Sequence, residues 1–153
     1  MTTMRDGAPH GYSVFSFDGN QYSIEFRAAR RPIDYQMNII APEFLPAADV
    51  DGTIIYANVF GGSELSDVMY SFAGGPWTPM LRVDEADPMY VKAYERDKDL
   101  KAPFRPLPGA VRSTHLWRAP MLNGMPPGVY PIHVKTTDMF GQTYIATRAI
   151  RVE

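Results

Sequence analysis

Residues 126–152 read PPGVYPIHVKTTDMFGQTYIATRAIRV, and this stretch decides the fold of the chain. Within it, residues 130–137 alternate between an apolar and a polar face, and a period of two is typical of a half-buried strand. The turn residues 138–141, which end in glycine, then precede a second run over residues 142–152. We therefore predict an antiparallel hairpin at the centre of a sheet, with earlier strands pairing around it.

Two positions in this predicted hairpin call for special geometry. Arg148 interrupts the apolar face of the second run, so we predict a β-bulge near Thr147. Tyr130 follows Pro127 and Gly128, and it suits a tyrosine corner, in which the hydroxyl bonds the backbone a few residues upstream. The alternative, that Tyr130 is simply a core aromatic residue, stays open.

The composition is that of a globular β protein. A length of 153 residues suits one domain, and 14 prolines and 12 glycines favour many turns and few long helices. The net charge of −2 leaves no electrostatic case for binding nucleic acid, and no apolar run is long enough to cross a bilayer. The absence of cysteine excludes disulfides, thiolate metal ligands and cysteine nucleophiles. We expect a single β-sandwich domain over residues 1–153, as a fragment of a larger enzyme.

Earlier strands are predicted from the same alternation. Residues 12–17 and 21–27 flank an Asp-Gly-Asn turn at 18–20, and Asp-Gly between alternating runs is a strong hairpin signal. Further strands are predicted over residues 35–41, 53–60, 67–72, 77–83 and 115–119, with 67–72 and 77–83 forming another hairpin. Eight or nine such strands fit an all-β fold, a two-sheet β-sandwich of the immunoglobulin or fibronectin type.

Residues 84–108 form a predicted insertion with one short helix. Asp87 followed by Pro88 is a typical helix start, because aspartate caps the first turn and proline fits the first helical position. Residues 89–100 are then expected to be helical, and the proline-rich residues 101–108 irregular. Insertions of this kind often contact another molecule.

The residues that could carry chemistry are few. His10, His115 and His133 are far apart, and none has a second ligand at the spacing of a metal site. We expect His133 to face solvent and His115 to be a structural hydrogen-bonding residue. No nucleophile elbow or phosphate-binding loop is present, so we predict no catalytic, metal-binding or cofactor-binding residue.

Aromatic side chains are the remaining candidates for a binding surface. We predict that Trp77 packs between the sheets, and we leave Trp117 open between core and surface. The candidate interface consists of His115, Trp117, Arg118, Tyr90 and Tyr94.

Five short stretches carry a family resemblance: residues 6–12 (DGAPHGY), 18–20 (DGN), 56–60 (YANVF), 115–119 (HLWRA) and 137–143 (TDMFGQT). With these stretches the chain resembles the C-terminal domain that follows the catalytic core of some bacterial calcineurin-like metallophosphoesterases. The resemblance implies a parent enzyme that hydrolyses phosphoesters with two divalent metals. The ligand motifs of such a centre are absent here, and Gln21 stands where a Gly-Asn-His motif would need histidine.

We therefore expect a non-catalytic accessory domain that docks on the metallophosphoesterase domain of the same polypeptide. The expected docking surface combines the insertion at 84–108 with residues 115–118. The alternative is a carbohydrate-binding or cell-envelope-binding module that uses Trp117 and nearby tyrosines. A free-standing hydrolase built on His115 finds the least support, and the sequence leaves the cellular compartment open.

Overall fold

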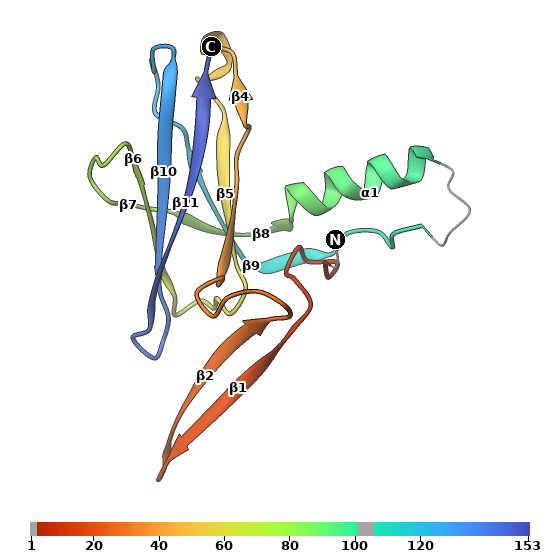
Figure 1. Cartoon of the computed structure of the whole chain (residues 1–153), viewed down its shortest axis with the longest axis vertical. Helices are drawn as coiled ribbons and strands as arrows, with labels where there is room; N and C mark the ends of the chain where they lie inside the picture. Colours follow the sequence, from red (N-terminus) through yellow and green to blue (C-terminus); the bar gives the residue numbers. More distant parts are fainter. Residues whose placement is uncertain (1–2, 101–105) are drawn as a thin grey trace.

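The computed structural model describes residues 3–100 and 106–153 and shows a two-sheet β-sandwich, a separate hairpin and a projecting helix (Figure 1). In chain order the elements are β1 (Gly11–Asp18), β2 (Gln21–Ala28), β3 (Met37–Ile40), β4 (Phe44–Leu45), a 3-10 turn (Ala47–Asp49), β5 (Ile54–Val59), β6 (Asp67–Phe72), β7 (Thr78–Pro79), β8 (Leu81–Ala86), α1 (Pro88–Leu100), β9 (Arg112–Pro120), β10 (Gly128–Thr137) and β11 (Thr143–Val152). The all-β class with one short helix is confirmed.

The strand order identifies the type of sandwich. One sheet has the order β3-β5-β9-β8, and the other has the order β4-β11-β10-β6-β7. These orders correspond to strands A-B-E-D and to a sheet containing G-F-C in the immunoglobulin fold. The apolar faces of both sheets meet in one core, which includes Ile55, Val68, Trp117, Ile132 and Ile150. The predicted immunoglobulin-like sandwich is confirmed.

The terminal hairpin lies at the centre of its sheet, as expected, but it contains no bulge. β10 and β11 pair continuously from Gly128 opposite Val152 to Thr137 opposite Thr143. The prediction of a bulge near Thr147 was wrong, because Arg148 faces the same side of the strand as Ala146 and Ile150, with no break in the pairing. The long side chain reaches the edge of the core, where Nη1 donates to the Ile39 carbonyl at 3.4 Å.

Tyr130 forms the predicted tyrosine corner. Its hydroxyl donates to the Pro126 carbonyl at 2.8 Å, four residues upstream. Ile132 follows two residues later and is fully buried, at the position where antibody domains carry their second disulfide cysteine. An apolar side chain therefore fills the centre of this cysteine-free core.

The predicted strand 77–83 is divided between the two sheets. Thr78 and Pro79 pair with β6, and the NH of the buried Met80 donates to the Val68 carbonyl at 2.9 Å. The chain then crosses so that β8 pairs with β9. Pro79 cannot donate to a further partner, which suits the edge of a sheet. Trp77 lies at this edge with 38% exposure and with Lys135 Nζ 4.8 Å from its ring centre. The prediction that Trp77 packs between the sheets was wrong.

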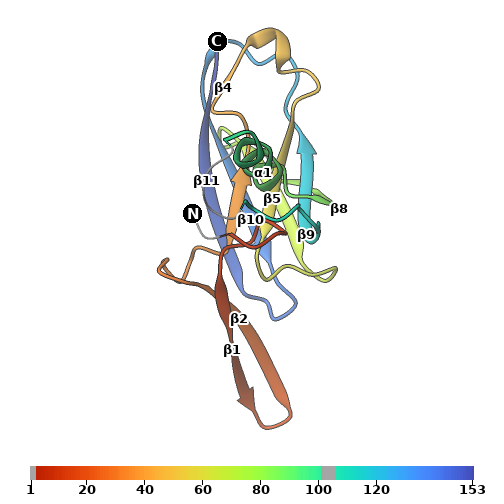
Figure 2. The same cartoon turned by 90° about the vertical axis from the view of Figure 1, so that its right-hand side faces the viewer.

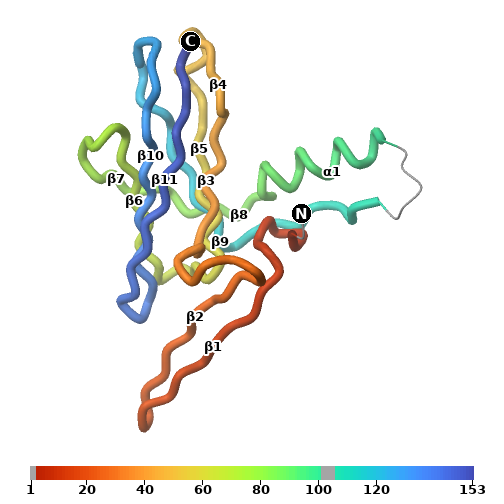
Figure 3. The backbone as a smooth tube through the Cα atoms, in the orientation of Figure 1, coloured from red at the N-terminus to blue at the C-terminus, as the bar shows by residue number. Residues whose placement is uncertain are grey.

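The first hairpin is confirmed, but it does not join the sandwich. β1 and β2 pair only with each other in register from Gly11 opposite Ala28 to Asp18 opposite Gln21. The hairpin extends away from the sandwich in both views and in the backbone trace (Figures 1, 2 and 3). Its base is held by buried Gln36, whose Nε2 donates to the carbonyl oxygens of Phe26 and Ile33 at 2.7 Å each.

Helix α1 begins where the sequence predicts and points away from the sandwich (Figure 1). Asp87 Oδ1 accepts a hydrogen bond from the Tyr90 backbone NH at 2.8 Å, which caps the first turn. Within the predicted irregular segment 101–108, residues 106–108 have no regular structure, and residues 101–105 lie outside the described residues. In the part of the chain that the structure describes, no helix has the length and apolar character needed to span a bilayer.

Candidate functional site

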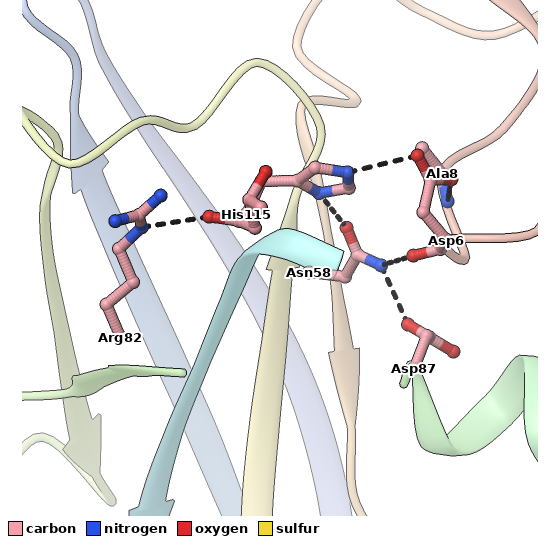
Figure 4. A network of polar contacts seen from close by, with 7 residues as sticks. Asp6, Ala8, Asn58, Arg82, Asp87 and His115 are labelled. Atoms are coloured by element: carbon pink, nitrogen blue, oxygen red, sulfur yellow. Dashed lines mark hydrogen bonds and ion pairs between the residues drawn. The ribbon is translucent and has the colours of Figure 1, made fainter. Parts of the chain in front are cut away.

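Asn58 lies at the centre of a buried polar network that joins four segments of the chain (Figure 4). Its side chain is on β5 and has 0% exposure. Nδ2 donates to the Asp6 carbonyl at 2.9 Å and to Asp87 Oδ2 at 2.7 Å, while Oδ1 contacts His115 Nδ1 at 2.8 Å. Because an unpaired buried amide is strongly unfavourable, full pairing makes this arrangement a stable junction.

Asp87 links the network to helix α1. Its carboxylate is fully buried, yet both oxygens accept hydrogen bonds, one from the Tyr90 backbone and one from Asn58. Gly7 lies directly against this carboxylate with φ of +87°, and a Cβ atom at position 7 would overlap the Asp87 side chain. Only glycine combines this backbone conformation with so close an approach.

His115 connects the network to the N-terminal segment. The Asn58 Nδ2 group donates to Asp6 and Asp87, which leaves Oδ1 facing His115 Nδ1. Because an amide oxygen can only accept, we assign a hydrogen to His115 Nδ1. The other ring nitrogen lies 3.3 Å from Asp6 Oδ2, and this contact is an ion pair when the ring is protonated. The prediction that His115 is a structural hydrogen-bonding residue is confirmed.

A second polar cluster lies on neighbouring strands of the same sheet. Arg118 Nη1 donates to Glu85 Oε1 at 2.7 Å, and the Tyr56 hydroxyl donates to Glu85 Oε2 at 3.3 Å. Burial raises the pKa of Tyr56, and the nearby Glu85 carboxylate raises it further. The neutral phenol therefore serves as a hydrogen-bond donor that links β5 to β8 across the intervening strand β9.

The five predicted interface residues differ in how far they are exposed to solvent. Trp117 is 3% exposed, and Gly62 lies so close to its indole that a Cβ there would crowd it. Tyr90 is also buried, with its hydroxyl donating to the Pro108 carbonyl at 2.8 Å. Tyr94 and Arg118 are partly exposed, and His115 is held in the network. The residues do not form one continuous accessible patch.

The network holds distant segments of the chain together. Among residues 3–100 and 106–153, no group of three or more histidine, cysteine or acidic side chains could hold a metal ion. The carboxylate, amide and imidazole groups instead bond one another. They tie the N-terminal segment, β5, β9 and the start of α1 into one junction.

The fold and this junction define an immunoglobulin-like β-sandwich domain with an inserted helix. A family model described as the C terminal of calcineurin-like phosphoesterase matches residues 1–144. The chain therefore belongs to this family, and the resemblance seen in its sequence is confirmed. Comparison with curated proteins gave no match, and neither did comparison with solved structures.

Sequence reasoning had not singled out three residues of the junction: Asp6, Gly7 and Asn58. A signal was nevertheless present, because the resembling stretches 6–12, 56–60 and 115–119 each supply a member of the network. The three stretches that resemble the family are thus far apart in the chain but meet at the junction.

Proposed function

We propose that this chain is a non-catalytic accessory domain that docks on the catalytic core of a calcineurin-like phosphoesterase, stabilises it and shapes substrate access. The observation that supports this proposal most strongly is the family match over residues 1–144. The closed network around Asn58 is consistent with it, since the polar groups there bond one another.

In this proposal the phosphoester chemistry belongs to the catalytic domain of the same polypeptide. Two divalent metals there would activate water and stabilise the charge that develops on the phosphoryl oxygens. This chain would supply none of their ligands. Its contribution to catalysis would be indirect, through the stability and shape of the catalytic domain.

The interface expected from the sequence, residues 84–108 with 115–118, stays a prediction. Of the five candidate residues in it, Tyr94 on α1 and Arg118 on β9 are partly exposed, whereas Tyr90 and Trp117 are buried. The carbohydrate-binding alternative relied on Trp117 as a stacking platform. Because the Trp117 ring is buried in the core, no specific observation now favours that alternative.

The test compares the full-length parent enzyme with a truncation that ends before this domain. We expect the truncated catalytic domain to have a lower Tm and a changed kcat/KM for a generic phosphodiester. Full-length Tyr94→Ser/Arg118→Ser tests the predicted interface, with Arg151→Ser, an exposed residue of β11 outside that interface, as its control. If truncation leaves both Tm and kinetics unchanged, the accessory role is refuted.

A further inference from the structure

Hairpin β1–β2 carries an apolar face that the rest of the chain covers only in part. In an antiparallel pair, residues opposite each other lie on the same face. Phe15 is opposite Ile24, and Phe17 is opposite Tyr22. Phe26, opposite Ser13, extends the same face toward the base of the hairpin.

The β2 side of this face packs on the sandwich. Phe26 contacts Phe60 with ring centres 5.7 Å apart, and Tyr22 makes an edge contact with Phe140 in the β10–β11 turn, also at 5.7 Å. The β1 side has no such cover, and Phe15 and Phe17 are 55% and 76% exposed. Strand β2 therefore contacts the sandwich, whereas the aromatic rings of β1 are exposed to solvent.

Two hollows lie beside the hairpin. A cavity of about 250 Å³ between β2 and the sandwich is lined by Ile24, Phe26, Phe60 and Met139, with Glu25 and Asp138 among its polar residues. A second hollow of about 570 Å³ at the tip of the hairpin borders Phe17, Tyr22 and Phe140, and the rest of its lining is polar: Ser16, Asp18, Asn20, Gln21 and Ser23. An apolar segment from outside the chain has room to enter between the hairpin and the β10–β11 turn.

The charge distribution favours an apolar protein partner. The face that carries Phe15 and Phe17 has no charged residue, because Glu25 and Arg27 lie on the opposite face and pair with each other at 2.7 Å. A two-stranded hairpin is marginally stable alone in water, and clustered exposed aromatics are typical of protein contacts.

We propose that this apolar face, Phe15, Phe17 and Tyr22 with the adjoining Phe140, docks against the catalytic domain of the same polypeptide. This inference rests on the proposed function. In a C-terminal domain the catalytic part is connected on the N-terminal side, and β1 is the first strand after that connection. A covalent connection makes this contact intramolecular, which raises the effective concentration of the two surfaces, so a small apolar contact suffices.

Hydrogen exchange locates the contact. Amides of β1 and β2 should exchange at least about tenfold more slowly in the full-length enzyme than in the chain 1–153 alone. If other surfaces of the domain become protected and the hairpin does not, this inference fails while the proposed function stands. If no surface becomes protected, both fail.

Two matched double variants of the full-length enzyme test the face itself. Phe15→Ser/Phe17→Ser should abolish the added protection, whereas Tyr12→Ser/Val14→Ser, on the opposite face of the same strand, should retain it. Circular dichroism of both variants in the chain 1–153 checks that each still folds. Equal loss of protection in the two variants would overturn the proposal. So would a dimer of the chain 1–153 that only Phe15→Ser/Phe17→Ser dissociates, because the occupant would then be a second copy.

Discussion

Asn58 Nδ2 donates a hydrogen bond to Asp87 Oδ2 at 2.7 Å inside the protein, across 29 residues of sequence. This contact joins a sandwich strand to the residue that caps helix α1. A buried carboxylate is tolerated only when its oxygens are bonded, so the position of Asn58 determines where the helix can leave the sandwich. The start of helix α1 is thus fixed to the sandwich by this hydrogen bond.

Removing the Asn58 side chain should destabilise the fold strongly. Asn58→Ala leaves Asp87 Oδ2, the Asp6 carbonyl and His115 Nδ1 without their partner, and we expect a loss of about 2–3 kcal/mol in the free energy of unfolding. Urea denaturation measures it. Asn38→Ala, on β3 of the same sheet, is the control, because among the residues that the structure describes the Asn38 side chain has a single, long hydrogen bond, 3.7 Å to the Met89 sulfur. Equal losses in the two variants would contradict a special role for the junction.

Gly7 and Gly52 form a matched pair for testing the close approach to Asp87. Both have positive φ, +87° and +90°, but a Cβ at Gly52 meets nothing within 4 Å. Gly52→Ala should therefore show only backbone strain of about 1–2 kcal/mol, whereas Gly7→Ala should lose clearly more. Thermal unfolding of both variants measures the difference. A Gly7→Ala protein as stable as Gly52→Ala would show that the N-terminal segment can move away from Asp87 freely.

The tyrosine corner makes a separable contribution to stability. Tyr130→Phe keeps the ring and removes only the hydrogen bond from the hydroxyl to the Pro126 carbonyl. We expect a loss of about 1 kcal/mol in urea denaturation. Tyr12→Phe, at an exposed site on β1, should change stability little. A Tyr130→Phe value indistinguishable from that control would mean that the corner bond contributes nothing.

Two tyrosines should make stability fall at alkaline pH. Burial raises the pKa of Tyr56 and of Tyr144 above the ordinary 10.0, with Glu85 adding to the first and Glu25 to the second. The unfolded chain loses these protons first as pH rises, so their contribution is complete below pH 10.0 and is lost as pH rises through the folded pKa values.

Tyrosinate absorbance measures this directly. The difference between the titration curves of the native protein and Tyr56→Phe/Tyr144→Phe should have its midpoint above pH 10.0. The double variant should also show a weaker decline in unfolding free energy at high pH. A difference curve centred at or below 10.0 would contradict the assigned environments.

Local features of the fold could be predicted because their partners are close in sequence. The Asp87 cap bonds Tyr90 three residues away, and the Tyr130 corner bonds Pro126 four residues away. Each hairpin is closed by a short turn between alternating runs. The candidate site was harder, because Asp6 and His115 are 109 residues apart, and no spacing rule connects them.

The sequence by itself determined the alternating strands, both principal hairpins, the helix start and the family. Alternation shows which residues share a face, but it does not show which layer covers that face. Only the tertiary structure decided that Trp117 lies inside while Trp77 lies at an edge, and that β1–β2 stands apart. Asn58 lies on the outward-facing side of its strand, yet the N-terminal segment and the start of α1 bury it. Only the tertiary structure could show this, because the covering segments are distant in sequence.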